Sequence, residues 1–216
     1  MTITFEFFGF LDWNWLGWIV FILLTLTYLF LILGSKDLKK NNYDSTTLLF
    51  ISGILLLACY LLLRLIIPSM VLSSYMPPTE LFLHNLYNLL FRYSIFAIPS
   101  SQTGGIFYIA FQIILGIGFI NVGSKNRDQG GTVMLVGGIL YLITWIIDLI
   151  TILSFIIGFS FPLFVALILA VTAYILPIVA AILILIFSIS TKRALFIVFG
   201  ALFLNFYSIQ FLIFIL

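Results

Sequence analysis

Long runs of apolar residues dominate the chain, and short polar clusters separate them. A helix needs about 20 apolar residues to cross the hydrocarbon core of a bilayer. The runs are continuously apolar, without the period-two alternation of a transmembrane strand. They predict an all-α fold, a bundle of six transmembrane helices at about 15–33, 48–67, 106–122, 132–153, 163–189 and 194–216.

The second and fourth of these helices resemble each other in sequence. TTLLFISGILLLACY in one aligns with GTVMLVGGILYLITW in the other, so that Gly53 matches Gly138, and the sixth helix offers a weaker match at Gly200. We interpret the pattern as three tandem helical hairpins, related by an axis along the membrane normal. The alternative is coincidence, because Gly-Ile-Leu strings are common in any helix rich in leucine and isoleucine.

Positive charge is concentrated in three polar turns, 34–47, 123–131 and 190–193. They hold seven of the nine Lys and Arg residues: Lys36, Lys39, Lys40, Lys125, Arg127, Lys192 and Arg193. With six crossings all three turns fall on one side of the membrane. The positive-inside rule then predicts cytoplasmic turns and both termini outside, in the cell membrane.

The segment 80–98 is the one apolar stretch that this count leaves over. It begins ELFLHNLYNLLFRY and repeats polar residues every four positions, at Glu80, His84, Asn88 and Arg92. One polar stripe on an otherwise apolar helix is typical of an amphipathic helix at the membrane surface. We therefore expect an outer-face helix, interfacial or re-entrant; the alternative is a seventh span, which would place the later basic turns opposite the first.

Composition agrees with a single integral membrane domain over 1–216. The chain is 64% hydrophobic and 7% charged, whereas a soluble domain carries roughly 25% charged residues. The net charge of +2 is too small to indicate a nucleic-acid partner. With Cys59 the only cysteine and His84 the only histidine, no metal site built on cysteine and histidine clusters is expected.

Two charged residues are predicted within the spans. Arg64 and Asp148 each lie sixteen residues beyond the start of their helix, about 24 Å from the cytoplasmic boundary at 1.5 Å per residue. Charge at such depth is costly, so we expect the two to approach each other, close to the polar stripe of 80–98. The alternative is that each reaches the outer interface alone.

The remaining strongly polar residues within spans are Gln112 and Asn205. Both are candidates for hydrogen bonds between helices or for the lining of a cavity. Small residues on the fifth helix form a separate ridge, at Ala166, Ala170, Ala173, Pro177 and Ala180, which we expect to pack inside the bundle.

No catalytic motif, cofactor motif or metal-ligand spacing emerges, so an enzyme is not expected. The function favoured is a small transporter or channel-like unit, with an outward-facing polar cavity. The alternative is a non-catalytic scaffold, assembly factor or partner subunit. Besides the lipid bilayer, the expected partners are a second copy of the chain or another membrane protein.

Overall fold

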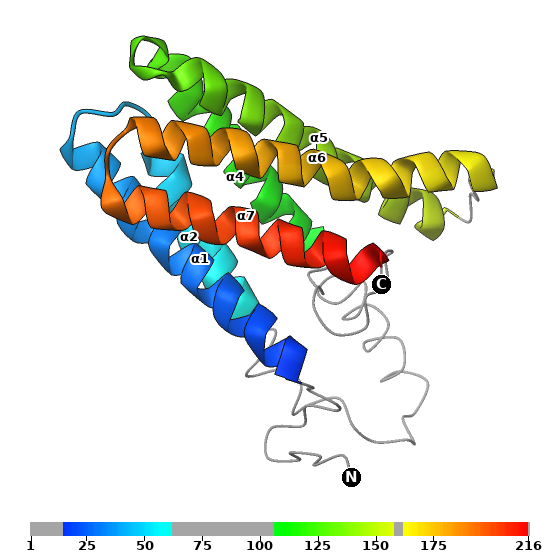
Figure 1. Ribbon diagram of the computed structural model, residues 1–216. Coiled ribbons are helices and arrows are strands. Elements are labelled where there is room, and N and C mark those ends of the chain that lie inside the picture. Colours follow the sequence, from blue (N-terminus) through cyan, green and yellow to red (C-terminus); the bar gives the residue numbers. More distant parts are fainter. Residues whose placement is uncertain (1–14, 62–105, 158–161, 216) are drawn as a thin grey trace, which may run out of the picture.

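The computed structural model describes residues 15–61, 106–157 and 162–215 (Figure 1). This part is all-helical, with short turns and no strand. Its helices are α1 (Trp15–Lys40), α2 (Thr47–Leu61), α4 (Ile106–Lys125), the short 3-10 helix η5 (Arg127–Gln129), α5 (Gly131–Ile156), α6 (Leu163–Ser190) and α7 (Ala194–Ile215). The expected outer helix 80–98 and Arg64 lie outside the described residues.

The described helices are those of a membrane protein. Four of them contain apolar stretches long enough to cross a bilayer, at Phe21–Lys40, Phe107–Lys125, Gly131–Thr151 and Val171–Ser190. Large apolar side chains also cover the outside of the bundle; Ile150 is 52% exposed and Phe164 is 73% exposed. An exterior of this kind is compatible with lipid and not with water.

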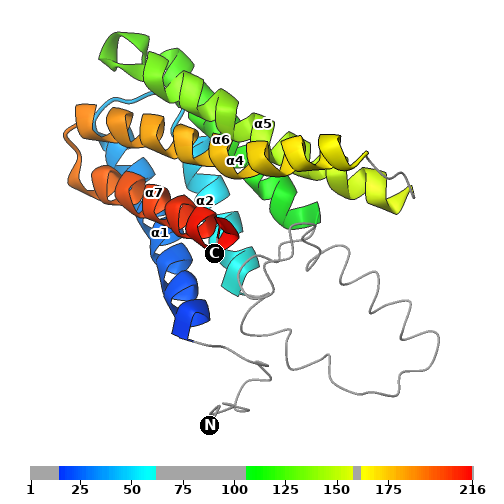
Figure 2. The same cartoon turned by 45° about the vertical axis from the view of Figure 1, so that its right-hand side comes forward.

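The six α-helices pack as a closed ring. Each contacts the helix before and after it along the chain, α2 contacts α4 across the gap between them, and α7 returns to contact α1. The turns within the hairpins α1–α2, α4–α5 and α6–α7 gather at one end of the molecule, at the upper left of Figure 1, and the same grouping appears in Figure 2. The predicted helical hairpins are therefore present in the described part.

The sequence repeat has a structural counterpart. Gly53 of α2 lies against α1, Gly138 of α5 lies against α4, and Gly200 of α7 lies against α6. A Cβ at any of these positions would come within 2.9 Å of an atom of the first helix in its own hairpin. The three glycines thus occupy equivalent places. At each of them the missing side chain lets the two helices of a hairpin approach closely.

The small-residue ridge of α6 packs inward where its side chains are described. Pro177 and Ala180 are buried and Ala173 is half-buried, and α6 continues as one helix through Pro177. A Cβ on Gly137 of α5 would lie 3.2 Å from the Ala180 carbonyl oxygen. This part of the prediction is confirmed: small residues on both helices bring α5 and α6 together.

Asn126 joins two of the turns. Its Oδ1 accepts a hydrogen bond from the Asp44 backbone N–H at 3.0 Å, and its Nδ2 donates to the Asp44 carbonyl at 3.2 Å and the Val122 carbonyl at 2.7 Å. The side chain is 5% exposed. The first hairpin turn is thus held to the end of α4 by a single amide.

We expect Asn126→Ala to loosen the 41–46 turn and to speed trypsin cleavage after Lys40 by roughly 5–30-fold, the equivalent of about 1–2 kcal/mol of lost local stability. Asn41→Ala is the matched control. Among the described residues the Asn41 amide bonds only to Asp37, in the last turn of α1, and does not reach α4. Equal cleavage rates in the two variants would contradict the bridging role of Asn126.

Candidate functional site

Five polar side chains meet inside the ring and form one hydrogen-bonded group. We call Tyr28, Tyr108, Gln112, Tyr141 and Tyr207 the tyrosine–glutamine layer. The Tyr28 and Tyr108 hydroxyls lie 2.5 Å apart, and Gln112 Nε2 donates to the Tyr28 hydroxyl at 2.9 Å. Tyr141 donates to Gln112 Oε1, and Tyr207 donates to the Tyr141 hydroxyl at 3.1 Å. The layer therefore joins α1, α4, α5 and α7.

Burial makes these contacts important. None of the five side chains is more than 8% exposed, and Gln112 is 1% exposed. A buried hydroxyl or amide without a partner costs about 1–3 kcal/mol, so each member relies on the others. Gln112 lies thirteen residues before the end of α4 and Tyr141 ten after the start of α5, which puts them roughly 15–20 Å from the turns.

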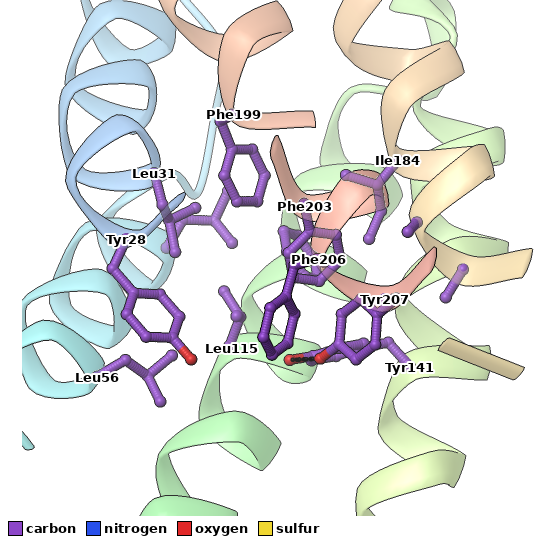
Figure 3. Packing of buried hydrophobic residues seen from close by; sticks show 14 of the residues in the cluster. Tyr28, Leu31, Leu56, Leu115, Tyr141, Ile184, Phe199, Phe203, Phe206 and Tyr207 are labelled. Carbon is purple, nitrogen blue, oxygen red and sulfur yellow. Dashed lines mark hydrogen bonds between the residues drawn. The ribbon is translucent and has the colours of Figure 1, made fainter. Parts of the chain in front are cut away.

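On the turn side of this layer the ring is filled by phenylalanines. We call Phe119, Phe196, Phe199 and Phe203 the aromatic plug; each is at most 2% exposed. The ring centroid of Phe199 lies 5.3 Å from those of both Phe196 and Phe203, and the Phe119 centroid lies 5.9 Å from that of Phe203. In Figure 3, Phe199 and Phe203 lie above the hydroxyls of Tyr28, Tyr141 and Tyr207. This half of the interior is closed by apolar packing.

On the other side of the layer the interior becomes polar again. Asp148 of α5 is partly buried, and it lies close enough to interact electrostatically with Tyr174 of α6 and Tyr207 of α7. Its Oδ1 is buried and has no hydrogen-bond partner among the described residues. One turn earlier, Trp145 packs edge-to-face on Tyr108 and Tyr141, with ring centroids 5.7 and 6.2 Å apart.

The structure separates the residues that the sequence singled out. Gln112 lies at the centre of the layer and bonds to two other helices, whereas Asn205 is exposed on the outer face of α7. Asp148 faces the interior. Arg64 and the stripe of Glu80, His84, Asn88 and Arg92 lie outside the described residues, so the expected approach of Arg64 to Asp148 stays a prediction.

Sequence reasoning missed the four tyrosines of the layer. Tyrosine in an apolar run belongs to the hydrophobic pattern, although a buried tyrosine hydroxyl usually finds a hydrogen-bond partner. The repeat held one usable signal. Tyr60, Trp145 and Tyr207 each stand seven residues after an equivalent glycine, and all three are buried.

The chemistry that this arrangement supplies is hydrogen bonding and aromatic contact. Cys59 is 7% exposed and lies in the core, away from solvent. Within the residues that the structure describes, no three His, Cys, Asp or Glu side chains are grouped to hold a metal ion. What remains is a carboxylate and aromatic rings beside a hydrogen-bonded layer, which can orient a polar group.

No protein-family model matches the chain, and no curated protein or solved structure matches it either.

Proposed function

We propose that all six helices cross the cell membrane, with the three turns in the cytoplasm and both termini outside. The basic residues at the turns gather at one end of the bundle, as the positive-inside rule requires. α7 has 22 residues, enough for the hydrocarbon core, and α2 runs antiparallel to α1 within its hairpin. In this orientation Asp148 lies on the outer side of the tyrosine–glutamine layer and the aromatic plug on the cytoplasmic side.

The protein, in this proposal, is a small transporter or channel-like unit with an outward-facing polar site. The observation that carries the proposal is the buried Oδ1 of Asp148, which lacks a hydrogen-bond partner among the described residues. Native proteins rarely leave such an atom unpaired, because its desolvation is uncompensated. In this proposal a donor on a solute entering from outside, rather than Arg64, supplies that partner, and the aromatic plug keeps the site closed toward the cytoplasm.

The surroundings restrict the class of solute. Asp148 accepts hydrogen bonds, so the solute needs a donor such as an amine or hydroxyl. Trp145, Tyr174 and Tyr207 provide aromatic surface near it, which suits a small organic molecule or an ammonium group. Among the described residues Asp148 is the one carboxylate here and its neighbours are aromatic, which disfavours inorganic ions of high charge density because their hydration could not be replaced.

Water access tests the outward-facing site. On a Cys59→Ser background, Asp148→Cys should react with a membrane-impermeant cationic thiol reagent added outside right-side-out vesicles. Phe203→Cys, in the aromatic plug, should react at least about tenfold more slowly because water is excluded there. Rates that are equally slow at both positions would refute the site.

Solute flux tests the function itself. Stopped-flow light scattering of proteoliposomes should show faster entry of ethanolamine or glycerol than in empty liposomes. Asp148→Asn should reduce the added flux about tenfold, because a hydrogen bond to a charged group is worth about 1.5–3 kcal/mol. Asp128→Asn is the control: Asp128 is exposed in the turn before α5, so its substitution should leave the solute flux unaltered.

The second candidate is a non-catalytic scaffold or partner subunit. Its support is the aromatic plug, which makes the cytoplasmic half of the bundle a dry, packed core. Absence of flux for both solutes, together with an Asp148→Cys thiol that stays unreactive, would favour this function over transport.

A further inference from the structure

The outward face of α7 differs from the equivalent face of α5. Val198, Ala201, Asn205, Ser208 and Leu212 follow one another at spacings of three and four residues, which places them along one side of the helix. Val198, Asn205 and Leu212 are exposed, while Ala201 and Ser208 are half-buried. We call these five residues the α7 stripe. The opposite side of α7 is covered by α1 and α6.

The repeat supplies an internal comparison for this stripe. Counted from the equivalent glycines Gly138 and Gly200, the same five positions on α5 are all apolar and all between 40% and 52% exposed: Val136, Ile139, Ile143, Ile146 and Ile150. On α7, alanine, asparagine and serine replace the three central isoleucines. α7 thus carries small and polar residues where α5 presents only branched apolar surface; α2 has an exposed alanine, Ala58, at the position equivalent to Asn205.

Asn205, at the centre of the α7 stripe, would be costly in free energy to expose to lipid. Asn205 lies eleven residues after the start of α7, about 16 Å along the helix, which is near the middle of a hydrocarbon core about 30 Å thick. Its amide is exposed and bonds to none of the described residues. Lipid offers an amide neither a donor nor an acceptor, so this side chain favours another protein surface as its neighbour.

We propose that the α7 stripe is the contact between two copies of this chain. A carboxamide both donates and accepts hydrogen bonds, so Asn205 complements the Asn205 of a second copy. Two copies inserted in the same orientation are related by a two-fold axis along the membrane normal, which brings identical depths together. Ala201 and Ser208, one turn to either side, let the two helices approach closely enough for the amides to bond.

Disulfide trapping of the full-length protein in its membrane tests this contact. On a Cys59→Ser background, Ala201→Cys should form a cross-linked dimer on mild oxidation. Ile139→Cys, the equivalent position on α5, is the matched control and should stay monomeric, because α5 presents no such contact. Equal cross-linking at both positions would overturn the proposal. Failure of Ala201→Cys to cross-link would also overturn it, and is the result expected if a different membrane protein covers this face.

The role of the amide is tested separately. Asn205→Leu should weaken self-association in proteoliposomes by about threefold to tenfold, measured by energy transfer between labelled copies at several protein-to-lipid ratios. Ile143→Leu, at the matching position on α5, should leave the association unchanged. An Asn205→Leu protein that associates as strongly as the parent would refute a contact centred on this residue.

Discussion

Gly123→Ala is expected to lower the free energy of unfolding by about 3 kcal/mol or more, at the upper end of the usual cost of overpacking. A Cβ at this position would lie 2.4 Å from the Leu135 backbone nitrogen and 2.7 Å from the Gly131 carbonyl oxygen. Both contacts are with backbone, which cannot rotate away as a side chain can. The whole α4–α5 hairpin would have to separate near its turn.

The native Cys59 provides the measurement. Its thiol is buried, so a fluorogenic maleimide should react with it only as the protein unfolds, and heating in detergent then gives an apparent Tm. Gly116→Ala is the control. There the new Cβ would lie 3.3 Å from Leu142 Cα and Cβ, a milder contact than those at Gly123, which a shift of a few tenths of an ångström relieves. The gain of about 1 kcal/mol in helix propensity is common to both variants, since both positions lie in α4. Similar Tm values for the two variants would contradict the argument.

The helices and hairpins were largely predictable because the bilayer imposes a simple rule. Every backbone polar group must be satisfied within the membrane, so long apolar runs become helices. The match between Gly53 and Gly138 was also readable, and the structure gives it a physical reason in the close approach of paired helices. Predicted boundaries were less accurate. α1 extends to Lys40, seven residues beyond the expected span, because hydropathy marks the apolar run and the polar residues after it are helical too.

The interior was not predictable from the same rule. In a span, inward and outward positions are both apolar, so hydrophobicity does not distinguish them. Gln112 and Asn205 look alike in the sequence, yet one is at the centre of the tyrosine–glutamine layer and the other faces outward. Tyr28 and Tyr108 are eighty residues apart in the chain, and only the closure of the ring brings their hydroxyls together.

The layer also breaks the internal symmetry of the fold. Leu56, Tyr141 and Phe203 occupy equivalent positions three residues after their glycines, and all are buried, but only Tyr141 carries a polar group. The hairpin α4–α5 supplies Tyr108, Gln112 and Tyr141 to the layer, whereas α6 supplies none. Asp148 belongs to that same hairpin. Specialisation is therefore concentrated in one hairpin of a repeated scaffold.

Tyr141→Phe tests the layer and is expected to lower the free energy of unfolding by about 1–3 kcal/mol, with little change in packing volume. The substitution removes the donor to Gln112 Oε1 and the acceptor for the Tyr207 hydroxyl, and it leaves both partners buried. Tyr43→Phe is the matched control. The Tyr43 ring packs edge-on against Phe187, but its hydroxyl bonds to none of the described residues, so its loss should cost less than about 0.5 kcal/mol.

A double-mutant cycle separates a cooperative layer from independent contacts. Gln112→Leu alone should also be destabilising, because it leaves the Tyr141 hydroxyl without its acceptor. In the double variant both partners of this hydrogen bond are removed, so neither stays buried and unpaired. The combined loss of unfolding free energy should therefore be smaller than the sum of the single losses by about 0.6–1.7 kcal/mol. Losses that add within about 0.3 kcal/mol would mean that the two residues act independently. The polar residues of the α4–α5 hairpin would then contribute through separate contacts and not as one coupled layer. Asp148 would be a polar residue of the interior that is independent of them.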